Sequence, residues 1–284
     1  MLRQLVNRLE QASALDPAGD KLKAAVQATI RPRKLRDVLH GVFLGHPLHP
    51  VLVQLPVGAF MSAAVLDLLP GQRRAATALV ATGVAGALPA AAAGLTDWAS
   101  LAREQRRVGL VHAVGNTIAL GLYAGSLAAR MTGRHRFGRM LGYAGLSVAG
   151  GSAYLGGHLS YKEGAGVNHA VPELRMIPEG WHHVASMAEL PVGKPVVRTV
   201  GSAPVLLYRH GDSVTAMIER CAHQGGPLSE GEVTGSGPSA CVVCPWHGST
   251  FRLTDGLVVR GPAASDQPVL RTRVAGGQVE ISLP

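Results

Sequence analysis

The chain has 284 residues, of which 16% are charged and 47% are hydrophobic, and its formal net charge is +9. So few charges argue against a purely soluble protein, and the lack of basic stripes with interleaved aromatic residues argues against nucleic-acid binding. Residues 1–177 carry 19 Lys and Arg against 9 Asp and Glu, whereas residues 178–284 carry 8 against 9. The two parts therefore predict different environments, and the basic, apolar first part predicts contact with anionic lipid.

The N-terminal residues predict a helix that is not removed as a signal peptide. MLRQLVNRLEQASALDP is too polar for a cleavable signal peptide. Residues 1–35 instead predict an amphipathic helical segment, in which one face carries Leu2, Leu5, Val6 and Leu9. This pattern fits an interfacial helix and a plain soluble helix equally well. The three cysteines of the whole chain are too few for a disulfide framework and fit a reducing compartment.

Four segments without acidic or basic side chains follow, each of roughly membrane-crossing length. They cover residues 50–66, 75–96, 108–129 and 140–157. The pattern predicts a membrane α-helical bundle of four transmembrane helices over residues 36–160, with a soluble helical bundle as the alternative. Eight Lys and Arg fall on the side of the two termini and six on the other side. This bias favours a multi-pass protein of the bacterial inner membrane with both termini in the cytoplasm.

The helices of an up-and-down bundle alternate in direction, so the start of the first and third segments and the end of the second and fourth lie at the same face. Five titratable residues fall at these ends. They are His46, His49, Asp97, His112 and His158. Ionisable groups at membrane depth are costly and often mark a functional site. Three interpretations stay open: histidines that bond interfacial carbonyls, a metal or haem b site that pairs His112 with His158 or His49, and a pocket for a quinone head.

The same region has a recognisable pattern of segments. DVLHGVFLGHPLHPVLVQLPVGAFMSAAVLDLL, GLTDW, HAVGN and GGHLSYKEGAGV occur in this order within residues 36–167. They resemble a widespread bacterial family of four-helix membrane proteins whose function is unknown. The resemblance implies a membrane bundle but no activity, so the haem hypothesis rests on the histidine positions alone.

The pattern changes after the apolar segments. Residues 161–177 have no sustained periodicity and predict a linker. Residues 178–284 contain short β-rich runs separated by turns, such as the HGD turn at 210–212. Short strands over this length predict a small antiparallel all-β barrel or sandwich.

Two short motifs in the β-rich part carry the chemistry. CAH at 221–223 and CPWH at 244–247 resemble the ligand motifs of Rieske iron–sulfur domains, as do the GGP and HGS that accompany them. The resemblance covers residues 178–284 and implies a [2Fe-2S] cluster with Cys221 and Cys244 on one iron and His223 and His247 on the other. Thiolates suit the ferric inner iron, and neutral imidazoles raise the reduction potential. A Cys2His2 zinc site is the alternative.

Departures from the high-potential Rieske pattern predict the subclass. Such proteins carry a disulfide between the two loops, where this chain has Gly226 and Trp246, and a tyrosine where this chain has Phe251. Ser249 remains as a hydrogen-bond donor to a cluster sulfur. The loss of donors predicts a ferredoxin-type module with a potential in the lower part of the range of roughly −150 to +300 mV. Cys241 reads as a strand thiol, with a dithiol switch as the alternative.

Together these features predict a membrane-anchored Rieske-type one-electron carrier. A quinone- or haem-linked oxidoreductase subunit and a redox sensor are the alternatives. The chain has neither a dinucleotide-binding turn nor a clear mononuclear iron site, so an electron-transfer component is expected rather than a self-contained enzyme. The expected partners are the lipid bilayer and a redox partner protein or quinone, and a homo-oligomer is left open.

Overall fold

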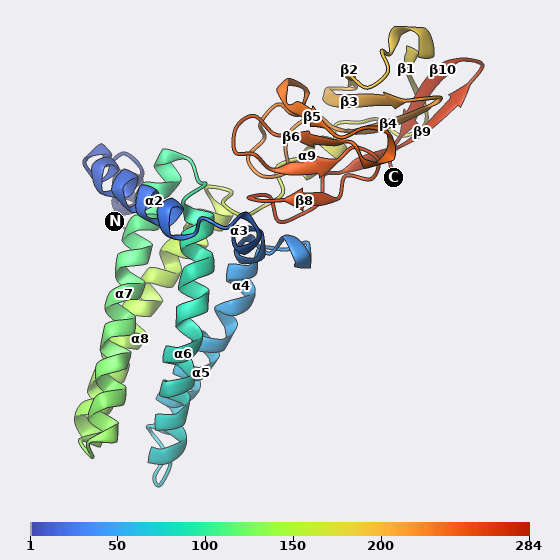
Figure 1. Ribbon diagram of the computed structural model, residues 1–284. Helices are drawn as coiled ribbons and strands as arrows, with labels where there is room; N and C mark the ends of the chain where they lie inside the picture. The colour runs from blue at the N-terminus through green and yellow to red at the C-terminus, as the bar shows by residue number, and fades with distance from the viewer. Residues whose placement is uncertain (1) are drawn as a thin grey trace. The chain divides into compact units, whose positions relative to one another are not determined.

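The computed structural model describes residues 2–284, which form two compact units (Figure 1). Met1, at the start of the predicted segment 1–35, lies outside the described residues, as does the side chain of Leu2. One unit holds Leu48–Ala165 with the N-terminal segment up to Leu35, and the other holds Arg36–Pro47 with Gly166–Pro284. The short segment 36–47 therefore belongs with the C-terminal part, although the sequence pattern places it with the membrane helices.

The helices lie mainly in the first unit. They are α1 (Leu2–Glu10), α2 (Asp16–Thr29), α3 (Arg33–His40), α4 (Leu48–Leu52), α5 (Gln54–Leu66), α6 (Arg73–Trp98), α7 (Arg103–Met131), α8 (His135–Tyr161) and α9 (Val171–Leu174). Figure 1 shows α5, α6, α7 and α8 as long helices that run alongside one another, with α5 packed on α6 and α7 packed on α8.

Three stretches of the described chain are long and apolar enough to cross a membrane. They are Leu48–Leu66, which joins α4 and α5, Arg73–Trp98 and Arg103–Met131. The helix α8 has 27 residues, or about 40 Å at 1.5 Å per residue, but is not among the three. It forms the fourth long helix of the bundle, and its crossing of the membrane stays a prediction.

Glycines on α6 and α8 admit an aromatic pair to the middle of the bundle. Phe60 of α5 and Tyr123 of α7 stack with ring centroids 3.5 Å apart and planes 4° from parallel. A Cβ atom at Gly83 would lie 2.3 Å from Phe60 Cε1, and one at Gly145 would lie 3.1 Å from Tyr123 Cδ2. These small residues thus make room for the two rings.

A buried ion pair fastens α5 to α7. Arg130 Nη1 donates to Asp67 Oδ1 at 2.9 Å, and Arg130 Nη2 donates to Asp67 Oδ2. The two side chains are 1% and 7% exposed. Arg130 Nε also donates to Ser126 Oγ at 3.1 Å. Removal of either partner would leave an uncompensated charge in an apolar place, so the pair locks these helices in register.

The second unit is built around two antiparallel sheets. Its strands are β1 (His182–Ser186), β2 (Pro195–Val200), β3 (Ala203–His210), β4 (Ser213–Ile218), β5 (Glu232–Thr234), β6 (Cys241–Val243), β7 (Thr250–Arg252), β8 (Val258–Arg260), β9 (Val269–Ala275) and β10 (Gln278–Ser282). The larger sheet has the order β1-β10-β9-β4-β3-β2, and the smaller has the order β5-β6-β7-β8. One hydrophobic core joins them, because Leu206 of β3, Val242 of β6 and Phe251 of β7 are fully buried in the same cluster.

Residues 36–47 pack on this β unit. Gly261 N–H donates to Asp37 Oδ1 at 3.0 Å, and Val42 packs against the β core. A Cβ atom at Gly261 would lie 2.8 Å from His40 Cδ2, so the His40 ring rests on the backbone of Gly261. Side-chain contacts of this kind leave no periodic signal, which explains why the sequence pattern did not assign the segment to this unit.

A methyl group at Gly83 should destabilise the helical bundle. The Phe60 ring would have to move, but it is held by its stack on Tyr123. We expect Gly83→Ala to lower the free energy of unfolding by about 1–3 kcal/mol, the usual cost of overpacking. Thermal unfolding of the detergent-solubilised protein, followed by far-UV circular dichroism, measures this. Gly121→Ala on α7 is the matched control, because nothing lies within 4 Å of its Cβ position. Equal melting temperatures for the two variants would contradict the packing argument.

Candidate metal centre

Two loops with the same hydrogen-bond pattern form the centre. In the first, Cys221 N–H donates to Gly226 O and Gly225 N–H donates to Cys221 O, both at 2.8 Å. In the second, Cys244 N–H donates to Ser249 O at 2.8 Å and Gly248 N–H donates to Cys244 O at 3.0 Å. Each loop thus returns on itself five residues after its cysteine.

The tight return of each loop depends on one glycine. Gly225 and Gly248 stand four residues after their cysteines and have φ values of +70° and +77°. Side chains other than glycine are strained in this region. The turn directs backbone N–H groups at each sulfur, from His223 and Gln224 to Cys221 and from Trp246 and His247 to Cys244. Such donors stabilise a thiolate and so prepare each sulfur to bind a metal.

The loops bring the four predicted ligands together in two layers. Cys221 and Cys244 are buried, at 1% and 3% exposed, and their thiols hydrogen-bond to each other. The rings of His223 and His247 lie on the outer side, with centroids 4.9 Å apart and planes at 84°. His247 is exposed and His223 is half-buried. Two inner thiols and two outer imidazoles are the donor set that a [2Fe-2S] cluster of this kind needs.

The protonation states suit metal binding. The hydrogen bond from Cys221 lowers the pKa of Cys244 to about 6, and the same bond, with burial, raises the pKa of Cys221. One thiolate is therefore favoured near neutral pH. Burial, with the neighbouring His247, His40 and His169, lowers the pKa of His223 to about 3. A neutral imidazole is the form that binds metal, so the residues present fit the cluster.

Gly226 keeps the two loops close. A Cβ atom there would lie 3.0 Å from Cys244 Sγ and 2.9 Å from Trp246 Cδ2. The Trp246 ring covers this glycine and is still 57% exposed. The two positions at which high-potential relatives carry cysteines are thus in contact, although neither holds a sulfur here.

Gln267 supports the first loop and was not foreseen from the sequence. Its side chain is 1% exposed, accepts from Ala222 N–H at 2.8 Å, and donates to the carbonyls of Ile218 and Arg220 at 2.7 Å each. It therefore joins the end of β4 to the loop that carries Cys221. A lone glutamine in a loop gives no recognisable motif, so only the fold reveals this role.

Ser249 supports the second loop. It is fully buried, and its Oγ accepts from Ala263 N–H at 2.9 Å. The donation of its hydroxyl hydrogen to a sulfur of the cluster stays a prediction from the sequence. Cys241 lies on β6, half-buried, and its Sγ donates to Ser239 O at 3.5 Å.

Two further histidines lie beside His223. His169 N–H donates to Ala222 O at 2.9 Å, and His40 is 6% exposed against Gly261. Both are close enough to contribute to the lowered pKa of His223. They come from outside the two motifs, and the sequence analysis gave them no role.

The predicted membrane-level residues have separate partners. His49 Nδ1 lies 2.8 Å from Ala90 O, and His112 Nδ1 lies 2.7 Å from Ser152 O. The Asn116 side-chain amide lies 3.0 Å from His112 Nε2, so both nitrogens of that ring are engaged. This arrangement is the one that the carbonyl-bonding interpretation describes.

The remaining members of that set do not join them in one site. His158 Nε2 lies 2.8 Å from Glu10 Oε1. The carboxylates of Glu10 and Glu163 lie beside it, and Lys162 Nζ lies 2.5 Å from Glu10 Oε1, so one ammonium group offsets part of their negative charge. The backbone carbonyl of Asp97 accepts from Ser100 Oγ at 2.7 Å. His46 is exposed and belongs to the other unit.

Comparison with known proteins divides the chain in the same way. Residues 180–272 match the Rieske [2Fe-2S] domain family, and residues 45–169 match a family of predicted membrane proteins, DUF2231. The chain is 31% identical to the anthranilate 1,2-dioxygenase ferredoxin subunit of Burkholderia cepacia over 103 residues, which are 36% of this chain and 92% of that protein. It is 33% identical to ferredoxin CarAc of Metapseudomonas resinovorans over 86 residues, 30% of this chain and 77% of that protein.

A solved structure is also similar. The ferredoxin of carbazole 1,9a-dioxygenase from Nocardioides aromaticivorans IC177 aligns with a TM-score of 0.35 at 24% sequence identity. The alignment covers 37% of this chain and all of that one.

Replacement of Gln267 should weaken the first loop. Gln267→Ala removes three hydrogen bonds to backbone groups, two of them buried, and a buried group left without its bond costs about 1–3 kcal/mol. We expect cooperative unfolding of the β unit at lower temperature, measured by near-UV circular dichroism, and less bound iron per chain. Gln278→Ala is the control, because Gln278 is exposed and its recorded side-chain bond is to exposed His183. If the two variants hold equal iron and melt together, Gln267 does not support the loop.

Proposed function

The chain belongs to the Rieske [2Fe-2S] family, and from this membership we propose that it carries single electrons at a membrane surface through Cys221, Cys244, His223 and His247. It is a Rieske [2Fe-2S] electron-transfer protein, and its match to predicted membrane proteins and its apolar helices make it a membrane protein. The observation that carries the ligand assignment is the equivalence of the two loops, which hold a buried thiol pair under an outer imidazole pair.

The cluster would supply one-electron redox chemistry, and the protein would control access to it. The inner cysteines are shielded from water and would hold the cluster in dry surroundings. The exposed His247 ring, with the 57% exposed Trp246 beside it, is where a partner protein would approach. His223 is half-buried and would hold the other ligand position steady.

The relatives suggest the class of partner. One is named as the ferredoxin subunit of a dioxygenase, and another is named as a ferredoxin. We infer a protein partner of the oxygenase or reductase type, with a quinone as the alternative. The excess of Lys and Arg on the side of the two termini favours a cytoplasmic position for these termini, and this supports a cytoplasmic position for the cluster.

Loss of an inner ligand should abolish the cluster. Cys244→Ser should leave the purified full-length protein without the broad visible absorption and the low-temperature EPR signal of a reduced [2Fe-2S] centre, because a serine hydroxyl is a poor ligand for iron at neutral pH. Cys241→Ser is a matched control three residues away and should keep two irons per chain.

The same measurement tests the alternatives. Stoichiometric zinc and no colour in the wild type would contradict the cluster assignment. Absorption bands in the Soret region that shift on reduction would establish haem, and the oxidoreductase alternative would then replace the simple carrier. Equal loss of iron in the two cysteine variants would make Cys241 a ligand as well.

Loss of the Ser249 hydroxyl should lower the reduction potential. If the hydroxyl donates to a cluster sulfur, it stabilises the more negative reduced state, and a hydrogen bond of about 0.5–1.5 kcal/mol corresponds to about 20–65 mV for one electron. We expect Ser249→Ala to lower the midpoint by an amount in this range in an EPR-monitored redox titration. Ser239→Ala, at a site whose hydroxyl bonds Ser236 O, is the control. An unchanged midpoint with full cluster content would show that Ser249 serves Ala263 alone.

A further inference from the structure

A cluster of cations lies at the start of α7, away from the iron–sulfur centre. Arg103, Arg106 and Arg107 fall within the first five residues of this 29-residue helix. Unpaired backbone N–H groups give a helix N-terminus a partial positive charge, which favours anions and disfavours cations. Three arginines at this end add to that positive potential, so negatively charged partners are favoured beside them.

Aspartates of α2 satisfy only part of this charge. Both carboxylate oxygens of Asp16 accept from Arg107, Oδ1 from Nε at 2.7 Å and Oδ2 from Nη2 at 2.8 Å. Arg107 Nη1 donates to Glu10 O at 2.7 Å. Asp20 is shared, because its Oδ1 accepts from Arg106 Nη2 at 3.0 Å while its Oδ2 lies 3.9 Å from Arg103 Nη2. Arg107 donates from all three of its side-chain nitrogens, whereas Arg106 donates from Nη2 alone.

Arg106 is buried with donors that have no acceptor in the described part of the chain. Its side chain is 9% exposed, and its Nε and Nη1 atoms are shielded from solvent without a hydrogen-bond partner. These two atoms carry three N–H bonds. Buried donors of a charged group are costly to leave unpaired, so a ligand that accepts from them would be bound favourably.

A fourth cation adds to the excess. Burial, then repulsion from Arg106, lowers the pKa of Lys23 on α2, so this ammonium group adds to the positive potential at that guanidinium. Four cations thus stand against the three carboxylates of Asp16, Asp20 and Glu104, which leaves one positive charge in excess. The missing partner should be negative rather than neutral.

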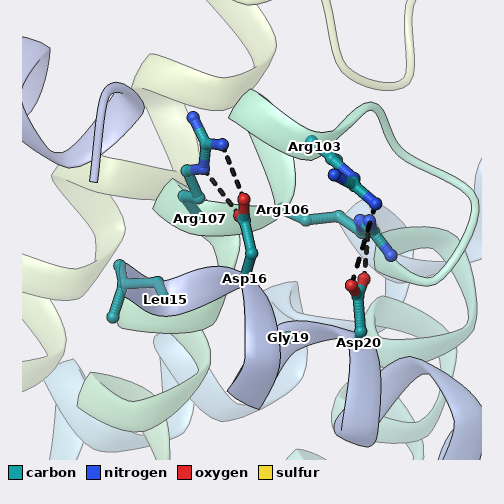
Figure 2. A pocket seen from close by; sticks show the side chains of 7 residues that line it. All are labelled: Leu15, Asp16, Gly19, Asp20, Arg103, Arg106 and Arg107. Carbon is teal, nitrogen blue, oxygen red and sulfur yellow. Dashed lines mark hydrogen bonds and ion pairs between the residues drawn. The ribbon is translucent and has the colours of Figure 1, made fainter. Parts of the chain in front are cut away.

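The cation cluster encloses a small cavity (Figure 2). Its volume is about 10 Å³, which admits one water-sized group. In Figure 2, the guanidinium groups of Arg103 and Arg106 converge on Asp20, while Arg107 pairs with Asp16 beside them. The cavity is lined by Leu15, Asp16, Gly19, Asp20, Arg103, Arg106 and Arg107. Arg103 is 64% exposed, so a larger ligand could insert one oxygen and leave its other atoms at the mouth.

We propose that this cavity binds an anionic oxygen of a phosphate group through Arg106, with Lys23 and Arg103 balancing the remaining charge. The arginines come immediately before the apolar part of a predicted membrane span, which is the depth of lipid headgroups. A phospholipid headgroup and free inorganic phosphate present the same chemistry. The site is independent of the proposed electron-transfer role.

Two binding experiments distinguish a phospholipid headgroup from free inorganic phosphate as the ligand. Native mass spectrometry of the full-length protein in detergent measures retention of phosphatidylglycerol against diacylglycerol with the same acyl chains, which lacks the phosphate. A titration with inorganic phosphate, read as the shift in the thermal unfolding midpoint of the helices, tests the free anion. Binding of the lipid, of the free ion or of both supports the phosphate site and identifies its source.

The variants test the residue assignment. Arg106→Gln should weaken phosphate binding about tenfold or more, as expected for loss of a charge-assisted hydrogen bond. Lys23→Gln should weaken it severalfold, and because Lys23 is only half-buried this variant keeps the test valid if Arg106→Gln fails to fold. Arg134→Gln, an exposed single-charge loss beyond the other end of α7, should bind like the wild type.

Three results would overturn the proposal. The cavity would hold only an ordered water if phosphatidylglycerol is retained no better than diacylglycerol and inorganic phosphate produces no shift. Equal losses in Arg134→Gln and Lys23→Gln would indicate general attraction to the net charge. Wild-type affinity in a folded Arg106→Gln protein would remove the residue on which the site depends.

Discussion

The constraint on which the centre depends is the tight return of two backbone loops about two buried sulfurs. Each loop closes by a bond from the cysteine N–H to the carbonyl five residues on, and each needs a glycine with positive φ at the fourth position. Because both loops have this pattern, the cysteines face inward together and the histidines face outward together. The backbone thus sets which of the four predicted ligands are buried and which face outward.

The surrounding fold holds these loops by buried polar contacts from distant positions. Gln267 fixes the first loop and Ser249 fixes the second, and both side chains are almost completely buried. Such contacts are effective because unpaired groups in a dry interior are costly. Segment 36–47 packs on the same unit through Asp37 and His40, so residues next to the first membrane span in the chain also contribute to the surroundings of His223.

The helical unit uses a different kind of stabilisation. Its small residues let rings and helices approach, as at Gly83 against Phe60, and its charges are used in pairs, as in the buried Asp67–Arg130 contact. The N-terminal helices add ion pairs to the start of α7, where Arg106 retains unused donors. His49, His112 and His158 find carbonyl or carboxylate partners on other helices of the same unit, which is how polar groups are accommodated in an apolar setting.

The sequence by itself determined the two-part organisation and the long apolar helices, and it supplied the four predicted ligand residues of the β unit. These features depend on local composition and on short fixed spacings, such as Cys-x-His and Cys-x-x-His, which a linear chain displays directly. Only the tertiary structure decided that Gln267 and His40 adjoin the centre, that segment 36–47 joins the β unit, and that Arg106 is buried beside Asp20. These contacts join residues far apart in the chain, and their formation depends on how whole elements pack, so no spacing encodes them.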